Sequence, residues 1–515
     1  MANLFAKQME RHLASSRVLA DAAASSRAAA GVIDIAGPKG AYLSLVIDSL
    51  HADQAGPSLV ITPTEKEAEN IVGDIEAFGR RAAVLFPWWE AAPYEGASPL
   101  ASIFGERVRI LADLLSREKA TVVAPLRAFL SPVPDPAALT SELFTVSRKQ
   151  KLDPVRTADR LARSGYLRVP SVTVHGEFAV RGEVLDVYVP GQRQAARILL
   201  DFDEVTSIRA FDPVDQGSTG ELASLRITPC REVTISEVLR APISESLQAQ
   251  GFSAAEAADV ISRLIDDPET PGAELFFPLC FPRQFSLLDF LGEGALVSLV
   301  DPDRLESNAA ALRKEYLELF RRARSKKQVV PGPQKILMDL GDLLARMPRR
   351  ADFPALPSSP EAPAVAAGTA GKDGLPADPG SQAPPRAAAR RTFTLPSDGP
   401  RSFFGNFTFF REEVEISLKN GYKVFIFAVY DVQADRLRHI LRDLPVEILP
   451  QSISGGFALP QEKVLAIQEA EIFGRKRRIP RSVGTARTAS IESFVELEQG
   501  DLVVHVNYGI GQFLG

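Results

Sequence analysis

Along the first 125 residues, short apolar runs alternate with longer segments in which apolar residues recur every three or four positions. The apolar runs predict buried strands and the longer segments predict amphipathic helices. We expect strands at 31–35, 58–62, 82–86 and 120–124, and helices at 41–50, 65–78 and 102–116. Such alternation is typical of a parallel α/β sheet. The preceding stretch, Phe5 to Ala24, has an amphipathic helical pattern with charges throughout, unlike a signal peptide.

The pattern changes after Pro125. From Arg168 to Asp212, apolar and polar residues alternate with a period of two, interrupted by Gly and Pro. This periodicity predicts an antiparallel sheet. After Arg226 the mixed α/β pattern returns, and we expect a helix at 254–265, a strand at 295–300 and a long charged helix at 303–326.

The region from 351 to about 395 is dense in Ala, Pro, Gly and Ser, and it predicts a disordered linker. A compact unit follows, with a strand at 423–429, a helix at 432–444 and a strand at 463–467. Residues 500–515 predict a strand, a turn and the start of a second strand, so we expect the last domain to be incomplete.

Composition narrows the possible functions. The 515 residues are enough for three to four domains, and the net charge of -6 provides no global basic field for nucleic acid. The two cysteines form no CxxC pair and the five histidines are scattered, so we expect no metal site; Cys280 lies in an apolar run and is expected to be a core thiol. Because no 18-residue apolar run occurs, we expect a cytoplasmic protein without contact to a membrane.

One turn superficially resembles a phosphate-binding loop. Such a loop needs GxxxxGK[ST], but here Lys39 precedes Gly40 and no Ser or Thr adjoins it. We therefore interpret Gly37, Lys39 and Gly40 as a non-functional strand-to-helix turn, and expect no nucleotide cofactor and no catalytic residue. The pair Trp88 and Trp89 could stack on bases, but packing beneath a helix is the favoured interpretation.

Three regions of the chain carry a resemblance to a known family. Residues 166–169 (YLRV), 175–190 (HGEFAVRGEVLDVYVP) and 197–213 resemble the second domain shared by UvrB and the transcription-repair coupling factors of the Mfd family. The stretch 86–95 (FPWWEAAPYE) is similar to their first domain, and 503–511 (VVHVNYGIG) resembles the start of the polymerase-interacting domain of Mfd. Unlike UvrB, this chain has neither a P-loop nor room for a damage-probing hairpin after Tyr94.

The resemblance implies a UvrB-like parallel-sheet domain with an inserted antiparallel α+β domain, a further small α/β domain and the start of a small Tudor-like β-barrel. The boundaries that we expect are 1–125 (domain 1a), 126–212 (domain 2, binding UvrA), 213–350 (domain 1b, packing with 1a), 351–395 (linker), 396–482 (domain 3) and 483–515 (start of the RNA-polymerase-interacting domain).

The resemblance also implies site residues. Arginines of domain 2 contact UvrA in the family; Arg168 and Arg181 match two of these positions, and the third is Ala179. On the predicted sheet the two arginines can share one face, with Tyr166, Phe178 and Glu183 as weaker neighbours; Phe178 could equally belong to the core. Val504, His505 and Tyr508 match part of the contact with the RNA polymerase β subunit, which we expect to be weak or lost. The basic run 475–481 could touch nucleic acid, although a solvated linker is favoured.

The sequence thus predicts an interaction module of transcription-coupled nucleotide excision repair that recruits UvrA to stalled RNA polymerase. The family's ATP-driven motor, through which it acts on DNA, is not expected here, because no GxxxxGK[ST] and no DExH-type box occurs. We therefore expect no enzymatic activity from this chain. The alternative is a UvrB-like ATP-dependent helicase subunit of the excision nuclease.

Overall fold

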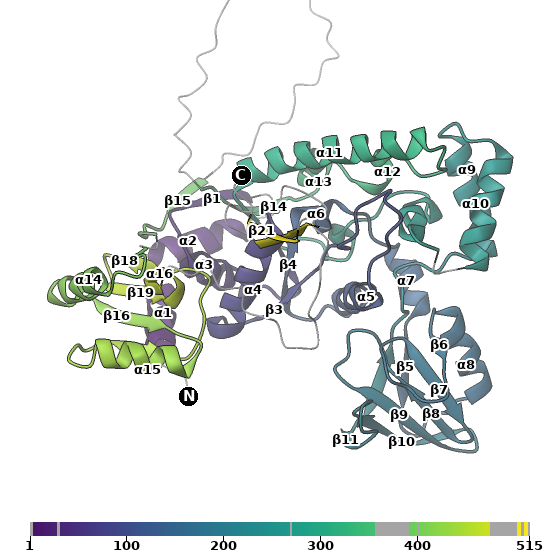
Figure 1. Cartoon of the computed structure of the whole chain (residues 1–515), viewed down its shortest axis with the longest axis horizontal. Coiled ribbons are helices and arrows are strands. Elements are labelled where there is room, and N and C mark those ends of the chain that lie inside the picture. The colour runs from purple at the N-terminus through teal and green to yellow at the C-terminus, as the bar shows by residue number, and fades with distance from the viewer. Residues whose placement is uncertain are drawn as a thin grey trace, which may run out of the picture.

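A seven-stranded sheet forms the centre of the molecule (Figure 1). The computed structural model describes residues 4–27, 31–267, 270–355, 391–399, 402–473, 502–505 and 509–512. The strand order is β15-β1-β14-β13-β2-β4-β3, and every neighbouring pair is parallel. The strands are β1 (Gly31–Ala36), β2 (Ser58–Thr62), β3 (Ala82–Leu85), β4 (Ala120–Pro125), β13 (Val297–Val300), β14 (Arg349–Phe353) and β15 (Arg391–Thr394). The predicted parallel α/β class is confirmed.

The helices of this region begin and end within about two residues of the predicted positions. They are α3 (Ala41–His51), α4 (Glu65–Phe78) and α5 (Ala101–Leu115). Thr64 caps α4, because its hydroxyl accepts a hydrogen bond from the Glu67 amide at 3.3 Å. The single amphipathic segment expected at the N-terminus is divided at Ser16 into α1 (Leu4–Ser15) and α2 (Arg17–Ser26).

The predicted linker is wrong at both ends. Ala351 to Phe353 belong to β14, and Arg391 to Thr394 form β15; the two strands lie on either side of β1. The low apolar content that suggested a linker applies to the segment between them, 356–390, which lies outside the described residues. Because β13 and β14 join β1 and β2 in one sheet, domains 1a and 1b share their central strands.

Domain 2 has its own core and lies apart from the parallel sheet (Figure 1). Its main sheet has the order β11-β10-β9-β8-β7-β6, antiparallel except for the β6–β7 pair. The strands are β6 (Leu167–Arg168), β7 (Glu177–Arg181), β8 (Val184–Val187), β9 (Ala195–Asp201), β10 (Glu204–Phe211) and β11 (Ser218–Glu221); β5 (Phe144–Ser147) pairs with β12 (Ser224–Ile227), and α8 (Pro154–Arg163) adjoins the sheet. This core extends from Val146 to Cys230, whereas Leu126 to Leu139, in α6 (Leu126–Leu130), α7 (Pro136–Glu142) and their connection, pack in the parallel-sheet core.

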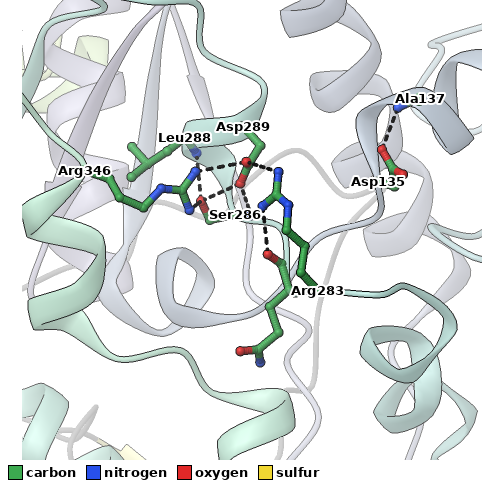
Figure 2. Close-up of polar contacts among 8 residues, drawn as sticks. Asp135, Ala137, Arg283, Ser286, Leu288, Asp289 and Arg346 are labelled. Atoms are coloured by element: carbon green, nitrogen blue, oxygen red, sulfur yellow. Dashed lines mark hydrogen bonds and ion pairs between the residues drawn. The ribbon is translucent and has the colours of Figure 1, made fainter. Parts of the chain in front are cut away.

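A helical layer continues the parallel-sheet core beyond domain 2. Its elements are η1 (Glu237–Leu239), α9 (Arg240–Gln248), α10 (Ala254–Asp266), η2 (Ala273–Cys280), η3 (Leu287–Asp289), α11 (Pro302–Ser325), α12 (Pro333–Ile336) and α13 (Leu340–Ala345). Cys280 is buried in this core, as predicted. Asp289 fixes the loop before β13: its carboxylate accepts from Arg283 at 3.0 Å and from Arg346 at 2.9 Å (Figure 2). Burial opposes ionisation there, but the Ser286 amide and the two arginines outweigh it and lower the Asp289 pKa.

Domain 3 consists of a four-stranded sheet, order β17-β16-β19-β18, with three helices. Its elements are α14 (Phe407–Lys419), β16 (Lys423–Phe427), α15 (Asp431–Ile440), β17 (Glu447–Leu449), β18 (Phe457–Leu459), β19 (Val464–Gln468) and α16 (Glu469–Phe473). Phe5 of α1 packs edge-on against Phe425 and Phe427 of β16 and against Phe78 of α4, with ring centroids 5.0–5.2 Å apart. Helix α1 therefore joins domain 3 and the parallel sheet into one continuous core.

The last described elements are two short strands, β20 (Leu502–His505) and β21 (Gly509–Gln512), which pair with each other in antiparallel register. The second strand, expected only to begin, thus has four paired residues. The described part of the chain contains no helix long and apolar enough to cross a membrane. Nor does that part bring three or more His, Cys, Asp or Glu together in a metal-binding arrangement.

Candidate interaction site

One face of the domain 2 sheet packs in the main domain core, and the other carries a line of charged residues beside a smaller apolar cluster. Val180, Leu185 and Ile198 lie in register on β7, β8 and β9, and their face packs against α8 in the domain core. Ala179, Asp186, Arg197 and Arg209 occupy consecutive strands on the opposite face. Because successive side chains on a strand point to opposite faces, the alternation that buries the core also sets this charged row on the other side.

Asp186 organises the charged row. Its carboxylate is almost completely buried and accepts hydrogen bonds from Arg197 at 2.7 and 3.0 Å and from Arg181 at 2.5 Å. Arg197 is mostly enclosed and lies over the Phe211 ring. Arg181 is 51% exposed, so part of its guanidinium faces solvent while Asp186 holds the side chain in one orientation. A fixed, half-exposed guanidinium can bind a carboxylate with little further loss of side-chain entropy.

The second predicted arginine lies elsewhere on the sheet. Arg168 is exposed, and its side chain has no hydrogen-bond or ion-pair partner among the described residues. In the β6–β7 register Arg168 pairs with Phe178, so these two side chains lie on the same face of the sheet. Ala179 and Arg181 are one and three residues after Phe178 on β7, so their side chains lie on the other face. The expectation that Arg168 and Arg181 share a face is therefore wrong: the sheet period of two places them on opposite sides of the sheet edge.

Two further predicted contact residues belong to the core. Tyr166 is buried, and its hydroxyl donates a hydrogen bond to the Thr228 carbonyl at 2.6 Å. Phe178 is also buried, among the apolar residues of the core face. Because both side chains pack in the domain core, neither can contact a partner protein. Glu183 is exposed, and its carboxylate accepts from the Phe202 amide at 3.3 Å.

The point where the chain leaves domain 2 is fixed by a buried ion pair, which we did not predict. Arg107 of α5 donates to Glu232 at 2.5 and 3.2 Å and to the Pro87 carbonyl at 2.7 Å. Trp89 donates its indole N–H to the same carboxylate at 2.9 Å. Trp88 and Trp89 are buried, as the packing interpretation predicted. The one feature of the sequence that could have indicated this ion pair was Arg107 itself, a charged residue on the apolar side of the predicted helix 102–116.

The P-loop-like turn is covered by domain 3. Lys39 donates its amide to the Ser397 hydroxyl at 2.9 Å and its ammonium to the Ala355 carbonyl at 3.3 Å. Ala41, the first residue of α3, donates its amide to the Gly455 carbonyl at 2.9 Å. In a functional P-loop these amides surround the phosphates. The amides of Lys39 and Ala41, which would donate to a phosphate in a P-loop, therefore donate to protein groups instead.

The covering segment, Ser454 to Gly456, is called the strap below. Asp74 of α4 accepts from the Ser454 amide at 2.7 Å and from its hydroxyl at 2.6 Å. Glu471 of α16 accepts from the Gly456 amide at 2.6 Å. Burial raises the pKa of Asp74 to about 6 and that of Glu471 to about 7, although the hydrogen bonds oppose the rise.

The predicted polymerase contacts lie mostly beyond what the structure describes. Val504 and His505 are in β20, which pairs with β21, but only their backbone is described. Tyr508 and the basic run 475–481 lie outside the described residues.

Comparison with known proteins defines the class of the module that carries Arg181. Residues 144–232 match the UvrB interaction domain family. The match begins at the first residue of β5 and ends at Glu232, so it coincides with the separately cored domain.

Most of the chain has relatives in one named family. It is 24% identical over 482 residues to the transcription-repair-coupling factor of Borreliella burgdorferi, covering 93% of this chain and 40% of that protein. Identity to the Bacillus subtilis factor is 24% over 513 residues, covering 93% and 42%; identity to the Mycobacterium tuberculosis factor is 31% over 292 residues, covering 53% and 23%. The chain is thus related, along most of its length, to the N-terminal region of the transcription-repair-coupling factors, and spans about two fifths of the length of the first two.

Proposed function

We propose that this chain acts in transcription-coupled nucleotide excision repair as a binding module that recruits UvrA through domain 2. The observation that carries the proposal is the coincidence of the UvrB interaction domain match, 144–232, with an independently cored domain that presents Arg181. The relatives are named for coupling transcription to repair, which supports the same role. RNA polymerase, through the region of Val504 and His505, is the second partner that we propose, with the contact of this chain weak or lost as expected from the sequence.

The chemistry of the UvrA contact follows from the geometry of Arg181. Its guanidinium is planar and permanently charged, and it can donate two parallel hydrogen bonds to a carboxylate. Asp186 holds the side chain, so binding requires little further ordering. We propose Arg181 as the principal charged contact and Arg168, on the other side of the sheet edge, as a separate and weaker one.

The alternative of a UvrB-like ATP-dependent helicase subunit has less support. Its nucleotide site would need the amides of the turn from Gly37 to Ala41, and the Ala41 amide is bonded to the strap. We therefore propose that the chain is a binding module and carries no ATPase site at this turn.

Titration of purified UvrA against the wild-type chain and the Arg181→Ala variant tests the proposal. Loss of a charged contact that UvrA would enclose should weaken binding at least about tenfold, equivalent to 1.4 kcal/mol. Arg156→Ala is the matched control, because Arg156 lies on α8 of the same domain and is 90% exposed; it should leave the affinity unchanged. Unchanged affinity in Arg181→Ala would overturn the proposed contact.

Stability must be measured in parallel, because Arg181 is bonded to a buried carboxylate. Arg197 still pairs with Asp186 in the variant. The half-exposed Arg181 should therefore contribute about 1 kcal/mol or less to folding. Hydrogen exchange of the β8 and β9 amides reports whether the domain remains intact.

A further inference from the structure

We propose that the tip of the β9–β10 hairpin is part of the same protein interface and that Phe202 is its apolar anchor. The inference rests on the proposed function, since it assigns a second contact to the UvrA-binding surface. Its basis is the backbone conformation, exposure, anchoring and position of one aromatic residue.

Phe202 is unfavourable in two respects for a residue without a partner. Its side chain is 86% exposed, which leaves a large apolar ring in water. Its φ is +57°, in the left-handed region that bulky residues rarely adopt. With Asp203 it forms a two-residue turn between Asp201 and Glu204, and the first position of such turns strongly favours glycine when φ is positive there. A strained and exposed aromatic side chain indicates a role other than folding.

The tip is held in place from two sides. The Phe202 amide donates to the Glu183 carboxylate at 3.3 Å, and the Leu200 amide donates to the Glu183 carbonyl at 2.8 Å. On the other side, the Leu152 amide donates to the Asp203 carbonyl at 2.6 Å. The ring is therefore presented on a fixed turn, which reduces the entropy lost when a partner covers it.

Phe202 lies at the same end of the sheet as Arg181. The register connects Arg181 to Val184 on β8 and Val184 to Leu199 on β9, and Phe202 follows three residues after Leu199. The Glu183–Phe202 hydrogen bond joins the β7–β8 turn directly to the tip. A partner that reaches Arg181 at this end of the sheet therefore meets the tip as well.

The charges around the ring define the partner surface. Asp201, Asp203, Glu204 and Glu183 are all exposed around Phe202. Lys151 pairs with Asp203 at 3.6 Å, so the tip remains acidic by the other three carboxylates. The complementary surface on UvrA is an apolar pocket with a basic rim, beside a carboxylate that accepts from Arg181. An aromatic ring in such a pocket, surrounded by charged pairs that exclude water, has the composition of an interface hot spot.

Phe202→Gly provides the test because binding and folding should change in opposite directions. Glycine retains the amide that donates to Glu183 and relieves the positive φ, so the β9 and β10 amides should exchange no faster than in the wild type. Titration with purified UvrA should nevertheless show at least tenfold weaker binding. Phe202→Trp should retain the affinity, because it keeps an aromatic side chain at the tip.

Val214→Ala is the matched control. Val214 is 92% exposed in the turn after β10, at the other end of the same sheet, and its truncation should leave UvrA affinity unchanged. If Arg181→Ala weakens binding and Phe202→Gly does not, the tip is not part of the interface and this inference is wrong, while the proposed function stands. If the wild-type chain does not bind UvrA at all, the proposed function fails first.

Discussion

Arg107 and Glu232 form an ion pair in which both side chains are completely enclosed, 0% and 1% exposed. The pair joins helix α5, which packs in the parallel-sheet core, to the last residue of the segment that matches the UvrB interaction domain. Trp89 donates to the same carboxylate, so three elements meet at one buried charge. This contact anchors the end of domain 2 to the parallel-sheet core.

Removal of one partner of this pair should destabilise the fold strongly. Arg107→Ala leaves the Glu232 carboxylate buried without its cation, which typically costs about 3–5 kcal/mol. Urea unfolding followed by the fluorescence of the adjacent tryptophans measures the loss. Arg263→Ala is the control, because its pair with Asp259 is exposed and should contribute less than about 1 kcal/mol. Equal effects from the two variants would show that the buried pair does not stabilise the junction.

Tyr166 should affect stability and not recognition. Tyr166→Phe removes the hydroxyl that donates to the Thr228 carbonyl and should cost about 1–2 kcal/mol. In folded protein the UvrA affinity should equal that of the wild type, because the ring is buried. Calorimetry of unfolding together with UvrA titration separates the two effects. A loss of affinity without a loss of stability would contradict this prediction and indicate that Tyr166 is part of the contact surface.

Docking of the strap should depend on Gly40. A Cβ atom at this position would lie 2.3 Å from the Gly456 carbonyl oxygen and 2.7 Å from that of Gly455, so Gly40→Ala should displace the strap and accelerate amide exchange at Ser454 to Gly456. Gly182→Ala is matched in backbone strain: its φ is +59° against +54° for Gly40, but nothing lies within 4 Å of the added Cβ. The control should leave exchange in the strap unchanged, and acceleration in both variants would exclude a local effect.

With the strap docked, the turn from Gly37 to Ala41 should not bind ATP. The Ala41 amide donates to Gly455 and the Lys39 amide to Ser397, so neither is available to a phosphate. Equilibrium titration with ATP and magnesium should give no saturable binding. Low-micromolar affinity would contradict the prediction and favour the helicase alternative.

The docked strap should also make stability depend on pH through Asp74. Burial raises the folded-state pKa to about 6, above the ordinary value of about 4. The folded state therefore holds this proton more tightly than the unfolded state, so its contribution is complete below about pH 4 and is lost as the pH rises to about 6. Asp74→Asn should remove this part of the pH dependence, of order 1–3 kcal/mol. Unfolding curves of the wild type and of Asp74→Asn at pH 4, 5, 6 and 7 measure the difference in the free energy of unfolding. Identical pH profiles for the two proteins would contradict the prediction.

Several features of the fold could be predicted because they depend on local periodicity. The strands at 31–36, 58–62 and 120–125 are short apolar runs, and the helices between them have a spacing of three to four. The prediction of a linker at 351–395 was wrong at both ends, and the reason is physical. β14 and β15 are short strands adjoining a Pro/Ala-rich segment, and both pair with β1, whose sequence is more than 300 residues away from theirs. β14 also pairs with β13 on its other side.

The sequence by itself determined the parallel α/β class and the antiparallel character of domain 2, because both depend on the spacing of neighbouring residues. Arg181 was singled out through the resemblance to a known family, and its contact with UvrA stays a prediction. Only the tertiary structure decided that Arg168 lies on the other face, that Tyr166 is buried and that Arg107 meets Glu232. It also decided that the strap covers Gly40, a contact between residues more than 400 positions apart. Periodicity specifies which face of an element is apolar, but strand register and long-range packing specify which polar side chains remain exposed together.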